Sequence, residues 1–269
     1  MAKIGILGAA GRMGQMIAKE ILSGAYDGAV LAAAAEHAGS DALGRDIGAL
    51  CGHGDCGVVI TADRDAVFSA SDVLIDFTTP VATVDNAAMA HQTGKGLVVG
   101  TTGLTTVEDA AITSAATRAP MLQAANMSVG VNVLLSVVEQ LAARLGPKEF
   151  DIEIFEAHHK HKIDAPSGTA LALAQSAAKG RGVDLDAAMV PARYGQIGAR
   201  PEGSIGMSVF RGGDVIGDHT VTFAALGERI EIGHRASDRA LFARGAVRAA
   251  LWLAGKPAGR YTMRDVLGI

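Results

Sequence analysis

Residues 3–24 read KIGILGAAGRMGQMIAKEILSG, a short apolar run followed by a glycine-rich turn and a helical pattern. Gly8, Gly11 and Gly14 space this turn as G-x-x-G-x-x-G. In a dinucleotide-binding turn, the first glycine permits a sharp bend, the second lets the backbone approach a pyrophosphate, and the third lets helix and strand pack closely. The spacing alone is weak in a chain of 34 glycines. Its place between a strand and a helix nevertheless predicts a phosphate-binding turn.

Further buried strands alternate with helices over the first half of the chain. Apolar runs at 29–36, 72–79 and 96–103 predict strands, and segments 81–94 and 106–118 predict the helices between them. Short apolar strands that alternate with helices are typical of a parallel sheet covered on both faces. Residues 1–127 are therefore predicted to form a doubly wound, Rossmann-like α/β domain.

The second half has a different pattern. Residues 129–146 predict a long amphipathic helix, and 151–159 alternate as a strand with one covered face does. That face is expected to carry Ile152, Ile154 and Phe155. Alternating runs within 204–236, separated by GGD and LGE turns, predict an antiparallel sheet.

These patterns predict two domains. The dinucleotide-binding domain is 1–127, completed by a C-terminal helix within 238–269 that has Ser237 as its N-cap. The substrate-binding and oligomerisation domain is 128–237, an α+β domain with a mixed or antiparallel sheet. Because a sheet with a broad exposed apolar face often pairs with copies of itself, we expect an oligomer.

Composition excludes several classes of function. The net charge is −4, the sequence pI is about 6.1 and aromatic residues make up 4%, so nucleic-acid binding is not expected. The sequence has no signal-peptide pattern and no apolar run of about 18 residues, so we expect a cytoplasmic protein without a membrane span. Cys51, His53 and Cys56 lie in one glycine-rich segment. This segment is interpreted either as a surface loop or as part of a metal site that lacks a fourth ligand.

Glu36 ends the second predicted strand, where a carboxylate can accept hydrogen bonds from the adenosine ribose. His37 follows it and cannot form the guanidinium fork that favours a 2′-phosphate. Arg12, within the glycine turn, is a second candidate for a phosphate contact. The sequence therefore favours NADH without excluding NADPH.

Three later segments are expected at the same edge of the sheet, since two of them close predicted strands and the third occupies the equivalent place at the domain junction. They are DFTTP at 76–80, GTTG at 100–103 and AANMSVG at 124–130. Ligands of open α/β sheets bind outside the carboxyl ends of the strands, so these segments are candidates for the nicotinamide end of the cofactor. Each is also explained by an ordinary turn.

Residues 156–175 read EAHHKHKIDAPSGTALALAQ and crowd five potential cations into 158–162, just before a predicted helix. An anion between them would relieve the repulsion. The Ser167 and Thr169 hydroxyls and the backbone N–H groups of the helix start offer it a binding site. Lys162, crowded by cations, is expected to have a lowered pKa and to donate a proton. A His-His-x-His metal site and a solvated basic loop remain as alternatives.

The sequence resembles the dihydrodipicolinate reductase family of bacterial lysine and diaminopimelate biosynthesis over essentially its whole length. The segments that carry the resemblance are EAHHKHKIDAPSGTA at 156–170, GAAGRMG at 8–14, DFT at 76–78, GTTG at 100–103 and AANMSVGVN at 124–132. The resemblance implies reduction of a cyclic dicarboxylate with NADH or NADPH by a homotetramer assembled through the sheet of the second domain. Members that use NADPH well often have arginine where this chain has His37.

The resemblance also implies residue roles. It places His158 as the acid/base residue and Lys162 as the proton donor, with His159, Gly168 and Thr169 on the substrate carboxylates. The residues that it implies for the dinucleotide are Gly8, Ala9, Ala10, Gly11, Arg12, Met13, Glu36, Gly100, Thr101, Thr102, Ala124, Ala125, Asn126 and Met127.

Two other functions fit the glycine turn. A different amino-acid or semialdehyde dehydrogenase would share the first domain but does not need the HHKHK and PSGT segments. A dinucleotide sensor without turnover would keep the turn and lose the acid/base residues.

Overall fold

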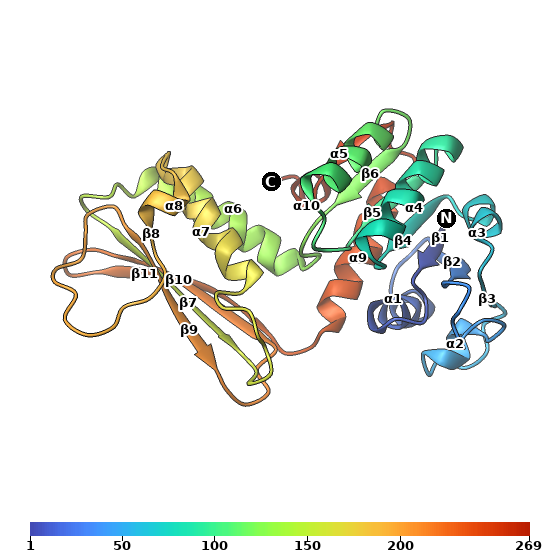
Figure 1. Cartoon of the computed structure of the whole chain (residues 1–269), viewed down its shortest axis with the longest axis horizontal. Helices are drawn as coiled ribbons and strands as arrows, with labels where there is room; N and C mark the ends of the chain where they lie inside the picture. Colours follow the sequence, from blue (N-terminus) through green and yellow to red (C-terminus); the bar gives the residue numbers. More distant parts are fainter. The chain divides into compact units, whose positions relative to one another are not determined.

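The computed structural model describes residues 1–269 and divides into two compact units, each with its own sheet (Figure 1). Unit 1 comprises Met1–Val129 and Ala240–Gly268, and unit 2 comprises Gly130–Arg239. None of the helices combines the length and the apolar character that crossing a membrane requires.

Unit 1 contains a seven-stranded parallel sheet with strand order β12-β6-β5-β4-β1-β2-β3. This confirms the doubly wound α/β prediction. Its strands are β1 (Ala2–Leu7), β2 (Ala29–Ala35), β3 (Ile60–Thr61), β4 (Val73–Asp76), β5 (Gly96–Val99), β6 (Pro120–Gln123) and β12 (Gly259–Tyr261). The strands β4 and β5 end earlier than the apolar runs predict, since the residues after Asp76 and Val99 already form turns.

Helices cover both faces of this sheet. One apolar core includes side chains of α1 (Arg12–Leu22), α2 (Ile47–Leu50), α9 (Ala240–Leu253) and α10 (Met263–Leu267). The other includes side chains of α3 (Arg64–Ala70), α4 (Pro80–Thr93) and α5 (Thr106–Ala115). Helix α9 begins at Ala240, so Ser237 lies outside its first turn and the N-cap prediction is wrong.

The glycine turn joins β1 to α1 as predicted. Gly8 has φ +77°, and a Cβ at Gly14 would overlap the carbonyl oxygen of Gly8. The third glycine is therefore what lets the helix begin against the turn.

Unit 2 packs two helices on one face of a five-stranded sheet. The helices are α6 (Val129–Arg144) and α7 (Gly168–Arg181), with a short α8 (Leu185–Ala188) after them. The sheet order is β11-β10-β7-β9-β8, from β7 (Asp151–His158), β8 (Met189–Val190), β9 (Ile205–Arg211), β10 (Gly217–Ala224) and β11 (Arg229–Ala236).

The sheet of unit 2 is mixed. Strands β10 and β11 form the predicted antiparallel hairpin, but β9 runs parallel to β7, which lies between β9 and β10. The predicted mixed sheet of this domain is therefore confirmed, whereas the prediction of an antiparallel sheet throughout 204–236 is wrong. The GGD turn connects two strands that are not neighbours, and sequence periodicity does not reveal that arrangement.

Alternation along β7 decides which side chains reach the core. Ile152 and Ile154 are buried, whereas Phe155 is 45% exposed on the opposite face, so its assignment to the covered face is wrong. Since side chains of a strand alternate between faces, Glu156 and His158 continue the buried row instead.

Candidate active site

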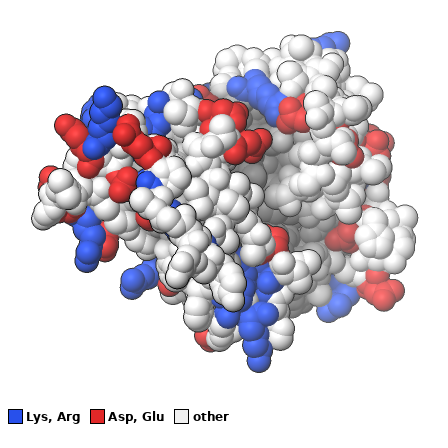
Figure 2. All heavy atoms as spheres, turned by 60° about the vertical axis from the view of Figure 1, so that its left-hand side comes forward, with Lys and Arg blue, Asp and Glu red and all other residues white.

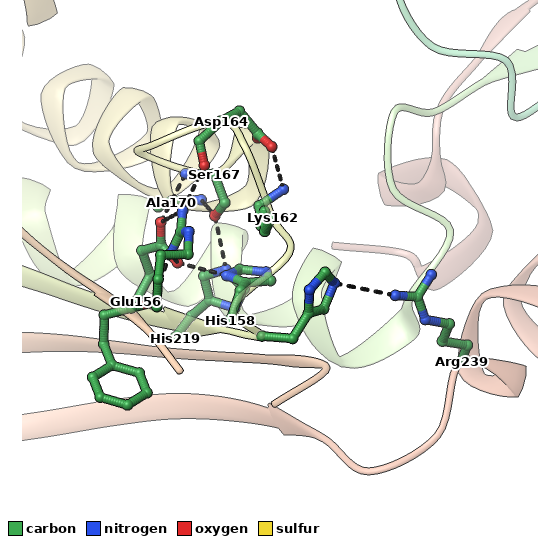
Figure 3. Close-up of polar contacts among 11 residues, drawn as sticks. Glu156, His158, Lys162, Asp164, Ser167, Ala170, His219 and Arg239 are labelled. Carbon is green, nitrogen blue, oxygen red and sulfur yellow. Dashed lines mark hydrogen bonds and ion pairs between the residues drawn. The ribbon is translucent and has the colours of Figure 1, made fainter. Parts of the chain in front are cut away.

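A buried carboxylate lies at the centre of the candidate active site in unit 2. Glu156 is fully buried, and Arg211 from β9 donates to both of its oxygens at 2.9 and 2.8 Å. The backbone N–H of Ser167 donates to Oε1 at 2.9 Å, and Nδ1 of His158 lies 2.5 Å from Oε2 (Figure 3). The carboxylate thus joins β7, β9 and the start of α7 in one hydrogen-bonded cluster, which we call the Glu156 cluster.

The ionisation of Glu156 follows from these contacts. Burial raises the pKa of its carboxyl group, but hydrogen bonds from Arg211, His158 and Ser167 together outweigh burial and lower the pKa below its ordinary value. The group is therefore a carboxylate at neutral pH and accepts a hydrogen bond from Nδ1 of His158.

The other ring nitrogen of His158, Nε2, is not held by Glu156. A Cβ built at Gly217 on the neighbouring strand β10 would lie 3.0 Å from Nε2 of His158. Glycine at this position therefore keeps Nε2 free of a crowding side chain. With Nδ1 held by Glu156, Nε2 is the ring nitrogen of His158 that is left to face a ligand.

Ser167 supports the cluster from inside. Its hydroxyl accepts from the N–H of Ala170 at 3.2 Å as the N-cap of α7, and it lies 3.2 Å from Nε2 of His219. The residue is only 2% exposed, so its side chain is committed to the fold rather than presented to a ligand. His219 in turn packs edge-on against the ring of His158, with centroids 5.2 Å apart.

His219 gives the fold a pH dependence of its own. Burial, followed by the charge of His158, lowers the pKa of His219 from 6.5 to about 4. Because the unfolded chain then binds more protons between about pH 6.5 and 4, acidification through this window destabilises the native state by up to roughly 3 kcal/mol.

We therefore expect His219→Gln to flatten the loss of unfolding free energy between pH 7 and 4.5. Denaturant unfolding of both proteins at the two pH values measures it. Parallel losses in wild type and variant would show that His219 does not titrate in this window.

The loop after β7 carries the remaining cations. Nζ of Lys162 lies 2.8 Å from Oδ1 of Asp164, so a carboxylate faces this ammonium in addition to the cations of the loop. Arg211 also donates to the carbonyl of Asp164 at 2.6 Å, which ties the loop to the Glu156 cluster. Lys160 is exposed, and its backbone N–H donates to Gly213.

His159, which follows His158, faces the guanidinium of Arg239. Its Nε2 lies 3.5 Å from the guanidinium of Arg239, and its Nδ1 is buried without a hydrogen-bond partner (Figure 3). Burial, then the charges of Arg239 and His161, lower the pKa of His159. A neutral imidazole with an unpartnered nitrogen and an adjacent guanidinium is a suitable partner for an anionic ligand.

The first residue of α7 faces open space. Gly168 is exposed, and nothing lies within 4 Å of a Cβ built on it. Since the first N–H groups of a helix have no partner within the helix, the start of α7 offers a donor at Gly168 and a positive dipole end to an anion. In unit 2 the sequence-predicted His158, His159, Lys162, Gly168 and Thr169 are therefore brought to one region.

No group of three or more His, Cys, Asp or Glu side chains is placed to hold a metal ion. In the Cys51–Cys56 segment, Asp46 instead accepts from the backbone N–H groups of Gly48, Cys56 and Gly57. Both cysteines are free thiols.

A groove of about 560 Å³ lies at the carboxyl ends of β1, β2 and β4 in unit 1. Gly8, Gly11 and Glu36 line it, as expected for a dinucleotide site. Oε2 of Glu36 accepts from the N–H of Ala10 at 2.9 Å, and Oε1 accepts from the N–H of His37 at 3.0 Å. The carboxylate is thereby fixed beside the glycine turn, so glycine-lined backbone and a held acidic group fit an adenosine diphosphate moiety.

A second pocket of about 390 Å³ contains Thr101, Thr102 and Ala125. The Thr101 hydroxyl lies within a buried network, where it accepts from the N–H of Thr78 and the hydroxyl of Thr83. Asp76 holds the same turn through Thr78 and Asn86, and burial raises the pKa of its carboxyl group despite these bonds. The DFTTP and GTTG turns are therefore locked together.

The other predicted cofactor residues have varied positions. Ala9 and Met127 are buried in the core, and a Cβ at Gly100 would overlap the ring of Phe77. Arg12 is exposed, Met13 packs against the core, Asn126 accepts from the N–H of Ser128, and the N–H of Ala124 donates to Val99. Most of this set shapes the backbone of the site rather than presenting side chains to it.

Sequence reasoning missed four participants: Glu156, Arg211, His219 and Arg239. Glu156 had a readable signal, since a strand that alternates from Ile152 and Ile154 places a carboxylate in the covered row. Arg211 and His219 are 55 and 52 residues from their partners in the cluster, so no local pattern identifies them.

Unit 1 has the fold and glycine turn of a dinucleotide-binding domain, and unit 2 brings ionisable side chains together beside the start of α7. Together they define a two-domain, dinucleotide-dependent oxidoreductase. The chain belongs to the dihydrodipicolinate reductase family: the model of its N-terminal part matches residues 2–127 and the model of its C-terminal part matches residues 130–267.

Curated relatives agree with this assignment. Two are the 4-hydroxy-tetrahydrodipicolinate reductases of Cupriavidus metallidurans, 50% identical, and Alkalilimnicola ehrlichii, 51% identical, each over 99% of both chains. Among solved structures, a dipicolinate-bound dihydrodipicolinate reductase from Paenisporosarcina sp. shares the fold. Its TM-score is 0.78 over 98% of each chain, at 23% identity. An amine dehydrogenase from Mycobacterium smegmatis is similar with a TM-score of 0.58 over 97% of this chain and 95% of its own.

Proposed function

We propose that this chain reduces the cyclic dicarboxylate 4-hydroxy-tetrahydrodipicolinate to tetrahydrodipicolinate with NADH or NADPH in lysine and diaminopimelate biosynthesis. The family and its curated relatives support the reaction class. The observation that carries the proposal is the placement of His158, Lys162 and the open start of α7 in one region of unit 2.

The two substrate carboxylates need separate cationic or N–H partners. We assign one carboxylate to the N–H groups of Gly168 and Thr169, where the dipole of α7 favours negative charge. We assign the other to His159 and Arg239, which lie together with Nε2 of the imidazole 3.5 Å from the guanidinium. Ser167 then acts indirectly, by capping α7 and fixing its first turn.

Proton transfer is assigned to His158 and Lys162. The 4-hydroxyl group and a proton from a neighbouring ring carbon leave together as water, and reduction of the resulting unsaturated ring then adds one hydride and one proton. We propose that Lys162 delivers the proton to the ring atom that becomes electron-rich, and that Nε2 of His158 acts as the acid/base group. The Glu156 carboxylate supports His158, since it accepts from Nδ1 and stabilises an imidazolium.

The residues of unit 1 would hold the cofactor. Bound there, a reduced nicotinamide supplies the hydride. The N–H groups of the glycine turn and of α1 would face the pyrophosphate, Glu36 would accept from the adenosine ribose, and the Thr101–Thr102 turn with Ala125 would adjoin the nicotinamide end. We propose that both cofactors serve and that NADH is favoured.

Glu36→Ala tests the ribose contact. We expect this variant to bind NADH about 10- to 100-fold more weakly, since a hydrogen bond to a charged group contributes about 1.5–3 kcal/mol. NADPH should be affected less, because the lost carboxylate also repels its 2′-phosphate. Fluorescence titration with both cofactors measures the two dissociation constants. Equal weakening would contradict the ribose assignment.

We also propose that unit 2 is the substrate and oligomerisation domain of a cytoplasmic homotetramer. The open face of its sheet supports an oligomer, since Phe155 and Phe210 are 45% and 47% exposed on neighbouring strands.

On the face drawn in Figure 2, Lys and Arg are interspersed with Asp and Glu and form no continuous basic patch.

An assay of purified protein tests the reaction. NADH or NADPH should be oxidised only when the condensation product of aspartate semialdehyde and pyruvate is supplied. Turnover on an unrelated carbonyl compound instead would indicate a different dehydrogenase. Cofactor binding without any turnover would indicate a dinucleotide sensor.

A further inference from the structure

Arg64, the first residue of α3, lines the cofactor groove together with Glu36 and His37. Its position follows from the sheet. β3 pairs with β2, and the N–H of Glu36 donates to the carbonyl of Thr61 at 3.0 Å. The chain therefore turns into α3 beside the carboxyl end of β2, where the acidic residue lies.

The guanidinium of Arg64 is held by an amide rather than by a carboxylate. Its Nη1 donates to Oδ1 of Asn86 at 3.0 Å, and Nδ2 of Asn86 donates to Oδ2 of Asp76 at 3.0 Å. Asn86 is only 2% exposed and Asp76 is fully buried. One edge of the guanidinium is thus anchored to the core, while its charge is not neutralised by an ion pair.

The other charged residues that line the groove are acidic. Glu36 and Asp85 both line the groove, and each would repel a 2′-phosphate. His37, next to Glu36 in sequence, is exposed and has no guanidinium fork. Arg64 is therefore the only permanently charged cation among the residues that line this groove.

We propose that Arg64 is the specificity-determining residue that lets this groove accept a 2′-phosphorylated adenosine, and hence NADPH beside NADH. The inference rests on the proposed cofactor site. Arg64 supplies from α3 the guanidinium fork that can bind a phosphate with two hydrogen bonds. His37, which follows Glu36 in the sequence, cannot supply such a fork. Glu36 retains the ribose hydroxyls of NADH, so the two side chains select for the two cofactors.

Binding of cofactor fragments to the full chain tests this without turnover. The probes are adenosine 2′,5′-bisphosphate and adenosine 5′-monophosphate, measured by isothermal titration calorimetry. Arg64→Leu keeps the apolar stem and removes the charge, and Arg64→Lys keeps the charge and removes the fork. Arg45→Leu is the matched control, since Arg45 is exposed in the same unit and does not line the groove.

We expect Arg64→Leu to weaken the bisphosphate about 10- to 100-fold, the range for a lost charged hydrogen bond, with little change for the monophosphate. Arg64→Lys should lose less, and Arg45→Leu should match wild type for both probes. Equal weakening of both probes by Arg64→Leu, or no weakening, would overturn the proposal. Fragment binding needs no substrate, so it can be measured whatever the reaction is. If the reductase assay fails but Arg64 still separates the bisphosphate from the monophosphate, only the proposed reaction is refuted.

Discussion

Replacing Lys162 by alanine is expected to lower kcat by roughly 10²- to 10⁴-fold, the usual contribution of a general acid. The physical reason is that Lys162 is the loop ammonium tied to Asp164 beside the Glu156 cluster, where it can pass a proton to the substrate ring. Cofactor affinity should change little, since the cofactor groove lies in unit 1. Steady-state kinetics at saturating NADH, with a separate NADH titration, measures both quantities.

Lys160→Ala is the matched control. It removes the same charge two residues earlier in the same loop, from an exposed side chain without a carboxylate partner. Its kcat should stay close to that of wild type. Comparable losses in the two variants would indicate that the loop contributes general positive charge and would remove Lys162 from the proton-transfer step.

Glu156→Ala is expected to lower the free energy of unfolding by about 3–5 kcal/mol, the usual cost of breaking a buried ion pair. The loss is large because Glu156 is fully buried and its removal takes away the carboxylate that both Nη atoms of Arg211, only 19% exposed, donate to. Equilibrium denaturation in urea at pH 7 measures the change. Activity should fall as well, because Nδ1 of His158 loses its acceptor.

Glu153→Ala provides the comparison on the same strand. Glu153 also receives a bidentate arginine, Arg193, but its side chain is 34% exposed on the opposite face of β7. Exposed pairs contribute about 0–1 kcal/mol, so this variant should be destabilised far less. Similar losses for the two variants would show that burial does not set the strength of the Glu156 cluster.

Acidification gives a second readout of Glu156. Its pKa is lowered in the native state, so its contribution to stability is complete above the unfolded value of about 4.3 and is lost as pH falls through the native value. The wild-type protein should therefore lose more stability than Glu156→Ala when the pH falls below about 4.3.

Local patterns predicted unit 1 well. The glycine turn, strands β2, β4 and β5 and helices α4 and α5 follow from apolar runs and spacings within a few residues, whereas β3, β6, α2 and α3 were not predicted. The positions of the site residues in unit 2 depend instead on the pairing of strands that are distant in the sequence. Strand β7 enters between β9 and β10, and this insertion brings Arg211 and His219 to Glu156 and Ser167.

The candidate site was likewise predictable only where its residues are close together in the sequence. The sequence placed His158, His159, Lys162 and Gly168 together because they lie in one short segment. It did not indicate that Ser167 is buried, which depends on the packing of His219 against it. It also gave no reason to connect Arg64 with Glu36, since the two meet only through the pairing of β2 with β3.

The division of unit 1 into two stretches of chain has a consequence for biosynthesis. Helix α9 packs against α1 and against strands β4, β5 and β6, and β12 adds the edge strand beside β6. While the ribosome is still translating unit 2, the nascent Met1–Val129 segment lacks these last pieces and leaves apolar surface of β4, β5 and β6 uncovered. Such surface attracts chaperones and invites aggregation, so unit 1 is expected to complete its folding only after translation has passed the end of unit 2.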